Sequence, residues 1–568
     1  MADHIAKRLL AALPSSEPSA AAENALDDDP TIQNGSLEKW SDELECILLT
    51  NGGVQRFRED TTMESSAMKE AGNGLHRAIL KAVVVPRGDG DRNSDWDDDD
   101  DTAANEATED FVDSLPGADA LDVANSEMDL GLLSSLLRAT GLFMRWNSQV
   151  SLIQSSDDVS KSCVSRLKFK SMVLLYAKFM DAEIPPTTTT SPTIDATTPA
   201  TNARPDVPRF AAICLFRATY GDDATTSAAR KLFVDSLDGC SYLMRSLLRG
   251  GQPVPRLFSV VRNVHHLIAA CPKSIPKMEL ALRTLAAIND DDDGDNDNDT
   301  EQRNGLSEAL VATLAWAYRS DPPFPGSDSD RRPDLVLEIL RALYALDNTG
   351  NDPSKSRPSD DTMNLLGAVL CDLLRFSNAN ERVYQVKLAV VTLLLNAPEG
   401  YGRYLVDNDG IAPLVDILSR QTSLVVIERN HNSSDDAATV VPITLALLRL
   451  IKTNDAARRA VKDEVFPPGA TEEAFARRAS AEMAKGVTEG ASRAKNMAPL
   501  DAPRGTLRWR LVRLMTWVDS NVKRSACELL WMLCGEDATE FVLRTGFGNA
   551  IHFLGIRGCV NMPAGVDG

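Results

Sequence analysis

The side chains that could bind a metal ion or act as nucleophiles are few and poorly grouped in this sequence. His265 and His266 form the one adjacent histidine pair. Neighbouring residues on a helix point about 100° apart, so these two cannot hold one ion by themselves, and we expect one to pack and the other to face solvent. Cys527 and Cys534 share a helical face, where packing is favoured over a metal site or a disulfide. No metal site is predicted.

Acidic tracts are the second group that could bind cations. Asp97–Asp101 and Asp290–Asp299 could attract divalent ions, but they lack the alternating ligands and closing Glu of an EF-hand loop, so solvated loops are favoured. The sequence contains no G-x-x-x-x-G-K-[ST], no G-x-G-x-x-G and no H-E-x-x-H motif. We therefore predict no cofactor and no catalytic residues, which favours a protein that acts by binding over an enzyme.

Basic residues gather near the C-terminal end of a strongly acidic chain. The formal net charge is −22 and the sequence pI about 4.8. So acidic a chain is not expected to bind nucleic acid through its phosphates. A basic cluster in such a chain can receive an acidic partner surface or pair with the chain's own acids, and the sequence leaves both open. The cluster consists of Arg504, Arg508, Arg510, Arg513, Lys523 and Arg524, with Asp519 as its one nearby acid.

Two amphipathic helices are expected to carry this cluster. Apolar residues recur at spacings of three and four, which places them on one face of a helix. Asp519–Asn521 supplies N-terminal capping side chains between the two helices, and Gly546–Asn549 breaks the pattern before a short helix resumes. The first face comprises Leu507, Leu511, Leu514, Met515 and Val518, and the second Val522, Ala526, Leu529, Leu530 and Leu533.

The whole chain shows the same helical rhythm. Of its 568 residues, 43% are hydrophobic and only 5% aromatic, and Leu, Ala and Val favour helices over sheets. Leu388–Leu395 resembles a buried strand by residue type, but its length and helical periodicity favour a helix. Pairs of amphipathic helices recur every ~40–50 residues, as in armadillo and HEAT arrays. The predicted fold is all-α, an armadillo/HEAT-like α-solenoid (superhelix) with long disordered acidic and Thr/Pro-rich loops.

Composition also predicts how the chain is divided. We expect a flexible N-terminus (1–35), a helical repeat domain (36–558) and a short tail (559–568). No apolar run reaches 18 residues, so no membrane span is predicted, and Asp3 with a short apolar run favours a cytosolic N-terminus. Nine scattered cysteines without a C-x-x-C pair indicate a reducing compartment. Disordered insertions are expected at about 86–122, 185–208, 289–304, 421–438 and 469–503.

The closing segment resembles a known family. Its strings LVRLMTWVDSNVKRSACELLWMLC, RTGFGNA and LGIRG, within Gly505–Gly558, are similar to the end of the helical core of synembryns, also called resistance to inhibitors of cholinesterase eight. These strings are specific because they include polar as well as apolar positions. Weaker similarity extends upstream to Arg332, through LEILRALY at 337–344, NLLG at 364–367, DGI at 409–411 with Leu414, and AARR at 456–459 leading to VFPP.

The resemblance implies a function. Synembryns bind the α subunit of heterotrimeric G proteins in its GDP-bound or nucleotide-free form, speed GDP release and act as folding chaperones, and their concave groove takes the α subunit's C-terminal helix. For this chain the expectation is thus a monomeric, cytoplasmic exchange factor and chaperone, recruited to the cell cortex or plasma membrane through the α subunit. The alternative is a general armadillo/HEAT scaffold whose binding ignores nucleotide state.

Candidate contact residues follow from the expected solenoid. Polar residues on the second helix of successive repeats line a concave face. The basic cluster is a separate candidate, as a supporting contact, and for every one of these residues ordinary solvated surface is the alternative. The concave-face candidates are Arg262, Asn263, His266, Arg341, Tyr344, Asn364 and Lys387, and the supporting candidates are Arg508, Arg513, Lys523 and Arg524.

Overall fold

The computed structural model describes most of the chain from residue 206 onward. The described ranges are 206–290 (without 223), 305–320, 324–325, 331–349, 359–377, 380–396, 401–429, 436–466 and 505–559, with single residues or short runs between 134 and 140 and between 173 and 181. Contacts divide the chain into two compact units, Met1–Ala309 and Leu310–Gly568, and each is considered by itself.

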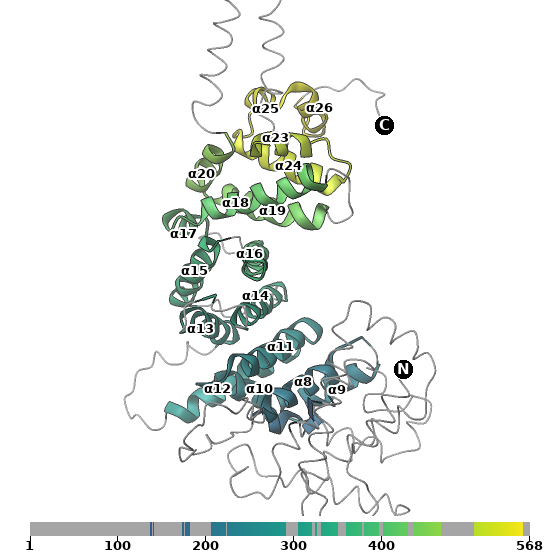
Figure 1. Cartoon of the computed structure of the whole chain (residues 1–568), viewed down its shortest axis with the longest axis vertical. Helices are drawn as coiled ribbons and strands as arrows, with labels where there is room; N and C mark the ends of the chain where they lie inside the picture. Colours follow the sequence, from purple (N-terminus) through teal and green to yellow (C-terminus); the bar gives the residue numbers. More distant parts are fainter. Residues whose placement is uncertain are drawn as a thin grey trace, which may run out of the picture. The chain divides into compact units, whose positions relative to one another are not determined.

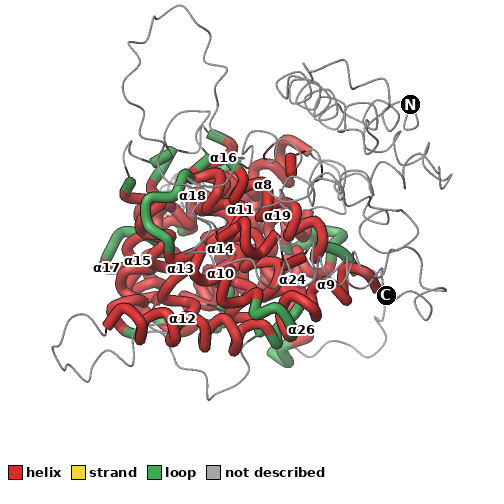
Figure 2. The backbone as a smooth tube through the Cα atoms, turned by 90° about the horizontal axis from the view of Figure 1, so that it is seen from below, coloured by secondary structure: helices red, strands yellow, loops and turns green. Residues whose placement is uncertain are grey.

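Every element in the described ranges is helical, and Figure 2 shows helices joined by loops without a strand among those residues. The predicted all-α, helical-repeat fold class is confirmed. The first unit contains α8 (Val207–Thr219), α9 (Ala224–Asp235), α10 (Gly239–Leu248), α11 (Val254–Ala270) and α12 (Ser274–Asp290). From the boundary onward follow α13 (Leu306–Arg319), α14 (Arg332–Asn348), α15 (Asp360–Arg375), α16 (Glu381–Leu394), α17 (Tyr401–Asp407), α18 (Ile411–Ser423), the π-helical η5 (Leu424–Arg429), α19 (Asp436–Thr453), α20 (Asp455–Val465), α23 (Leu507–Leu514), α24 (Ser520–Leu533), α25 (Ala538–Thr545) and α26 (Phe547–Ile556).

Capping side chains start several of these helices. Asp519 accepts hydrogen bonds from the backbone N–H of Asn521 at 2.8 Å and of Val522 at 3.0 Å, as the sequence predicts. Asn454 caps α20 in the same way through the N–H of Ala457 at 2.8 Å. The first N–H groups of a helix have no partner within it, so these side chains fix where the helix begins.

In the first unit, α8 packs against α11, and α10 packs against α12. Asn263 of α11 is buried, and its amide donates to the carbonyl oxygen of Ala212 on α8 at 2.9 Å. Further along the same helices, Nε2–H of His266 donates to the carbonyl oxygen of Thr219 at 2.8 Å. Polar side chains of α11 thus fix its position on α8.

The second unit is built around four neighbouring helices, which we name the parallel row. Helix α14 contacts α16, α16 contacts α19, and α19 contacts α24 (Figure 1). At the start of α14 and α16, Asp334 pairs with Arg382 at 2.7 Å. At their ends, Asn396 Nδ2 donates to Asn348 Oδ1 at 2.9 Å. Both pairs are 48 residues apart, so α14 and α16 are equivalent helices of successive repeats.

The remaining two members continue the row in the same direction. Arg449, late in α19, donates from Nη1 to the carbonyl of Leu395 at the end of α16 at 2.8 Å. Trp517, just before α24, donates from Nε1 to Oδ2 of Asp436, the first residue of α19, at 3.0 Å. Helices α15, α18, α20 and α23 pack beside the row. The row therefore repeats one helix orientation four times, as expected for stacked helical repeats.

The apolar spacing over Ala228–Arg249 predicts a single helix, and this prediction is wrong, because the structure has two helices there, α9 and α10. Asp238 between them has φ 49°, a left-handed conformation that cannot continue a helix. At Gly239 an added Cβ would lie 2.4 Å from the buried Phe233 ring. This close approach explains why a glycine stands at the turn. The turn could not be predicted from the apolar periodicity of the sequence.

Two further boundaries differ from the sequence prediction. Residues 421–429 are helical rather than loop, because Val425 and Val426 of η5 are buried. Helix α23 ends at Leu514 rather than continuing to Val518, which is 77% exposed and does not join the buried face. The break near Gly546 is confined to that residue, since α26 begins at Phe547.

The predicted flexible N-terminus, the C-terminal tail from 560, and the insertions at 86–122 and 469–503 lie outside the described residues, as do most of those at 185–208 and 289–304. Among the described cysteines, all seven are free and five are buried. No single helix in the described ranges has the length and apolar composition to cross a membrane, although one pair bent by 98°, Tyr401–Asp407 with Ile411–Glu428, passes on length and composition together.

Candidate partner-binding surface

The parallel row brings together five of the predicted contact residues. Arg341 and Tyr344 lie on α14, Lys387 on α16, and Lys523 and Arg524 on α24. Arg341 and Arg524 are exposed, while Tyr344 and Lys523 are half-buried. Arg341 makes a 3.5 Å pair with Glu338 one turn earlier. Four residues from the two ends of the row are thus available to a partner.

Lys387 has a different role from the one its sequence position suggests. It is only 2% exposed, and burial lowers the pKa of its amine, with Asp416 acting in the opposite direction. A buried ammonium needs compensation from the groups around it. Lys387 therefore belongs to the packing between helices and is not available to a partner.

Helix α19 supplies the middle of the row, where sequence reasoning placed no contact residue. Leu445 is 43% exposed, and Arg449, one turn later on the same helix, is also exposed. Val441, one turn before Leu445, is half-buried. The sequence feature that could have indicated this exposure is the position of Leu445 away from the helical face that carries Ile443 and Leu447. The exposed face of the row is thus apolar at its centre and cationic on both sides.

Three other predicted residues lie on helices outside the row. Asn364 is exposed on α15, and Arg513 is exposed on α23, where its guanidinium carbon lies 5.7 Å from the Trp509 ring centre. Arg508 of α23 is buried and donates from Nε and Nη2 to the carbonyl oxygen of Arg544, at 3.1 and 2.8 Å. It thereby satisfies one of the last carbonyls of α25, which is a structural role.

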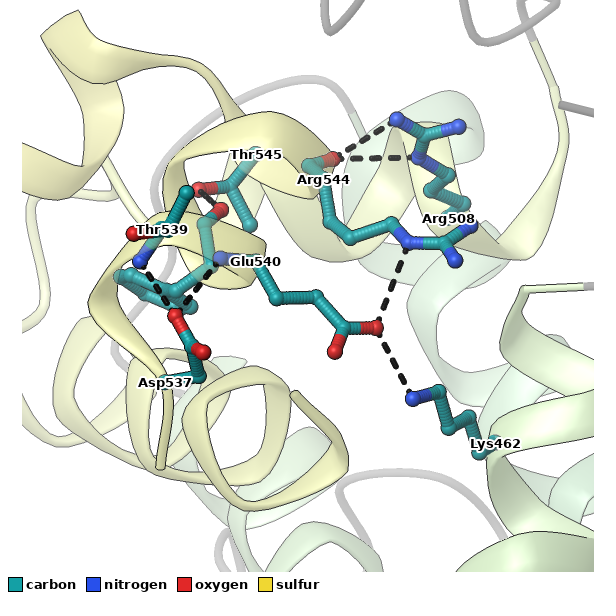
Figure 3. A network of polar contacts seen from close by, with 8 residues as sticks. Lys462, Arg508, Asp537, Thr539, Glu540, Arg544 and Thr545 are labelled. Atoms are coloured by element: carbon teal, nitrogen blue, oxygen red, sulfur yellow. Dashed lines mark hydrogen bonds and ion pairs between the residues drawn. The ribbon is translucent and has the colours of Figure 1, made fainter. Parts of the chain in front are cut away.

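Figure 3 shows how Arg508 is held at the junction of α20, α23 and α25. Glu540 accepts from Lys462 Nζ at 2.8 Å and pairs with Arg544 Nε at 3.6 Å. Burial lowers the pKa of Arg508, and the nearby Arg544 cation acts in the same direction. Asp537 caps α25 from below this network. These contacts join the closing helices to the preceding repeat.

Arg262, Asn263 and His266 all lie on α11 of the first unit. The guanidinium of Arg262 stacks over Phe216 at 4.4 Å, and the His266 ring lies 5.5 Å from Phe216. Tyr220, which the sequence did not single out, is exposed and stacks on Phe216 at 4.9 Å. Arg262 and Tyr220 offer a cationic and aromatic surface, whereas Asn263 is buried and serves packing.

No group of three or more His, Cys, Asp or Glu side chains suited to a metal ion occurs in the described part of the chain. What the geometry offers is a row of equivalent helices with exposed side chains along one face. That arrangement defines the class of α-helical repeat proteins, which bind partners along such faces.

Comparisons with known proteins narrow this class. Residues 498–565 match the family model described as guanine nucleotide exchange factor synembryn. The chain is 28% identical over 281 residues to "Chaperone Ric-8A" of Xenopus tropicalis, and 27% identical over 272 residues to the protein of that name in Mus musculus. Each alignment covers 44% of this chain and 44% of the relative, so the chain matches less than half the length of these relatives. The resemblance to the synembryn family, first drawn from the closing segment, is confirmed.

Among solved structures, an engineered protein aligns with a TM-score of 0.38 at 16% identity, covering 91% of this chain and 96% of that one.

Proposed function

We propose that this chain binds the α subunit of heterotrimeric G proteins, in the GDP-bound or nucleotide-free form, as a chaperone and exchange factor. The observation that carries the proposal is the synembryn match over 498–565, which covers all of α23–α26. The names of the curated relatives support the chaperone role. The parallel row supports it by offering an extended surface for a helical partner.

The mechanism is linkage between two binding equilibria. A protein that binds the nucleotide-free α subunit more tightly than its GDP-bound form lowers the affinity for GDP by the same factor. No catalytic side chain is needed, because binding energy alone shifts the equilibrium. GTP, by favouring the closed α subunit, would release the complex.

The direct test is GDP release from a purified α subunit, with and without this protein. We expect release to accelerate several-fold and a stable complex to form in nucleotide-free buffer. Capture from lysate is then compared with GDP, without nucleotide and with a GTP analogue. Equal capture in all three conditions, with no acceleration of release, would establish the general scaffold instead.

Substitutions on the exposed face of the parallel row provide a second test, at the level of single residues. Arg341→Glu combined with Arg524→Glu should weaken α-subunit binding about tenfold, since exposed contact cations act through charge complementarity. Arg403→Glu is the matched control, because Arg403 is a highly exposed arginine on α17, outside the row. If both variants bind equally well by calorimetry, the contact lies elsewhere. Arg513→Glu with Lys523→Glu tests the supporting contact in the same assay.

A further inference from the structure

We draw no further inference here: the strongest candidate, the cluster of Lys462, Arg508 and Arg544 around Glu540 at the junction of α20, α23 and α25, belongs to the network already described, in which Glu540 and the carbonyl oxygen of Arg544 are the partners of these cations.

Discussion

His266 is a titratable residue at a helix junction, and its environment makes a pH prediction. Burial lowers its pKa from 6.5, aided by Arg230 and His265, while the hydrogen bond to Thr219 and the charge of Asp222 act in the opposite direction. The unfolded chain therefore takes up a proton at higher pH than the folded one does. The stabilisation is complete above the unfolded pKa and is lost as the pH falls through 6.5 toward the folded value.

The prediction is that thermal stability falls between pH about 7.5 and 5.5, and that His266→Gln flattens this dependence. Glutamine can still donate to the Thr219 carbonyl but does not titrate. Melting curves over the pH range measure the effect, and His552→Gln, on the exposed side of α26, is the control. An unchanged pH profile in the His266 variant would mean that other groups carry the dependence.

At the scale of single residues, the sequence predicted which polar residues lie on the helices, but it did not predict which of them are buried. Arg341 and Arg524 lie exposed on the parallel row, as a polar surface residue should. Asn263 and Lys387 were predicted to be exposed by the same reasoning from helical position, but both are buried. Periodicity gives the face on which a residue lies, not how deeply a neighbouring helix covers it, and that depends on packing between distant segments.

At the scale of an element, the turn between α9 and α10 is set by one close contact. Alanine normally favours a helix over glycine by up to about 1 kcal/mol. At Gly239 the added Cβ would lie 2.4 Å from the buried Phe233 ring, and overpacking typically costs about 1–3 kcal/mol. We expect Gly239→Ala to lower the urea midpoint clearly. Gly250→Ala, with no atom within 4 Å of its Cβ position, should change it little.

If the two alanine variants unfolded at the same urea concentration, Phe233 would have room to move and the contact would not determine the turn. The same contact explains a limit of sequence reasoning. Helices were predictable because apolar spacing and capping residues such as Asn454 and Asp519 are local signals. The break at Asp238–Gly239 and the end of α23 at Leu514 depend on tertiary contacts, which leave no periodic trace.

At the scale of the whole molecule, each helix of the parallel row contacts the next helix of the row and the helices packed beside it. Stability in such a stack is a sum of nearest-neighbour terms. Leu394 of α16 is fully buried, and truncation to alanine typically costs about 2–5 kcal/mol. We predict that Leu394→Ala speeds amide hydrogen exchange in α14, α16 and α19 and leaves α25 and α26 unchanged. Faster exchange throughout the second unit would show a single cooperative domain instead.

The helical-repeat architecture followed from the sequence because its rhythm recurs along the chain. The family resemblance followed from polar and apolar positions within a single 54-residue segment, Gly505–Gly558. The exposure of side chains on α19 and α26 could not be predicted from the sequence, because Leu445, Phe547 and Ile556 are apolar residues of the kind usually found in a core. Only the arrangement of helices shows that nothing in the described chain covers them.

The 48-residue offset between α14 and α16 has a consequence for the evolution and engineering of this chain. Asp334 and Arg382, like Asn348 and Asn396, occupy corresponding places on parallel helices. Removing 48 residues between two such corresponding points would therefore join the first half of α14 to the second half of α16 in phase, with the core side of one continuing into the core side of the other. Between α14 and α16 the array can therefore lose or gain a 48-residue module with the core faces kept in register.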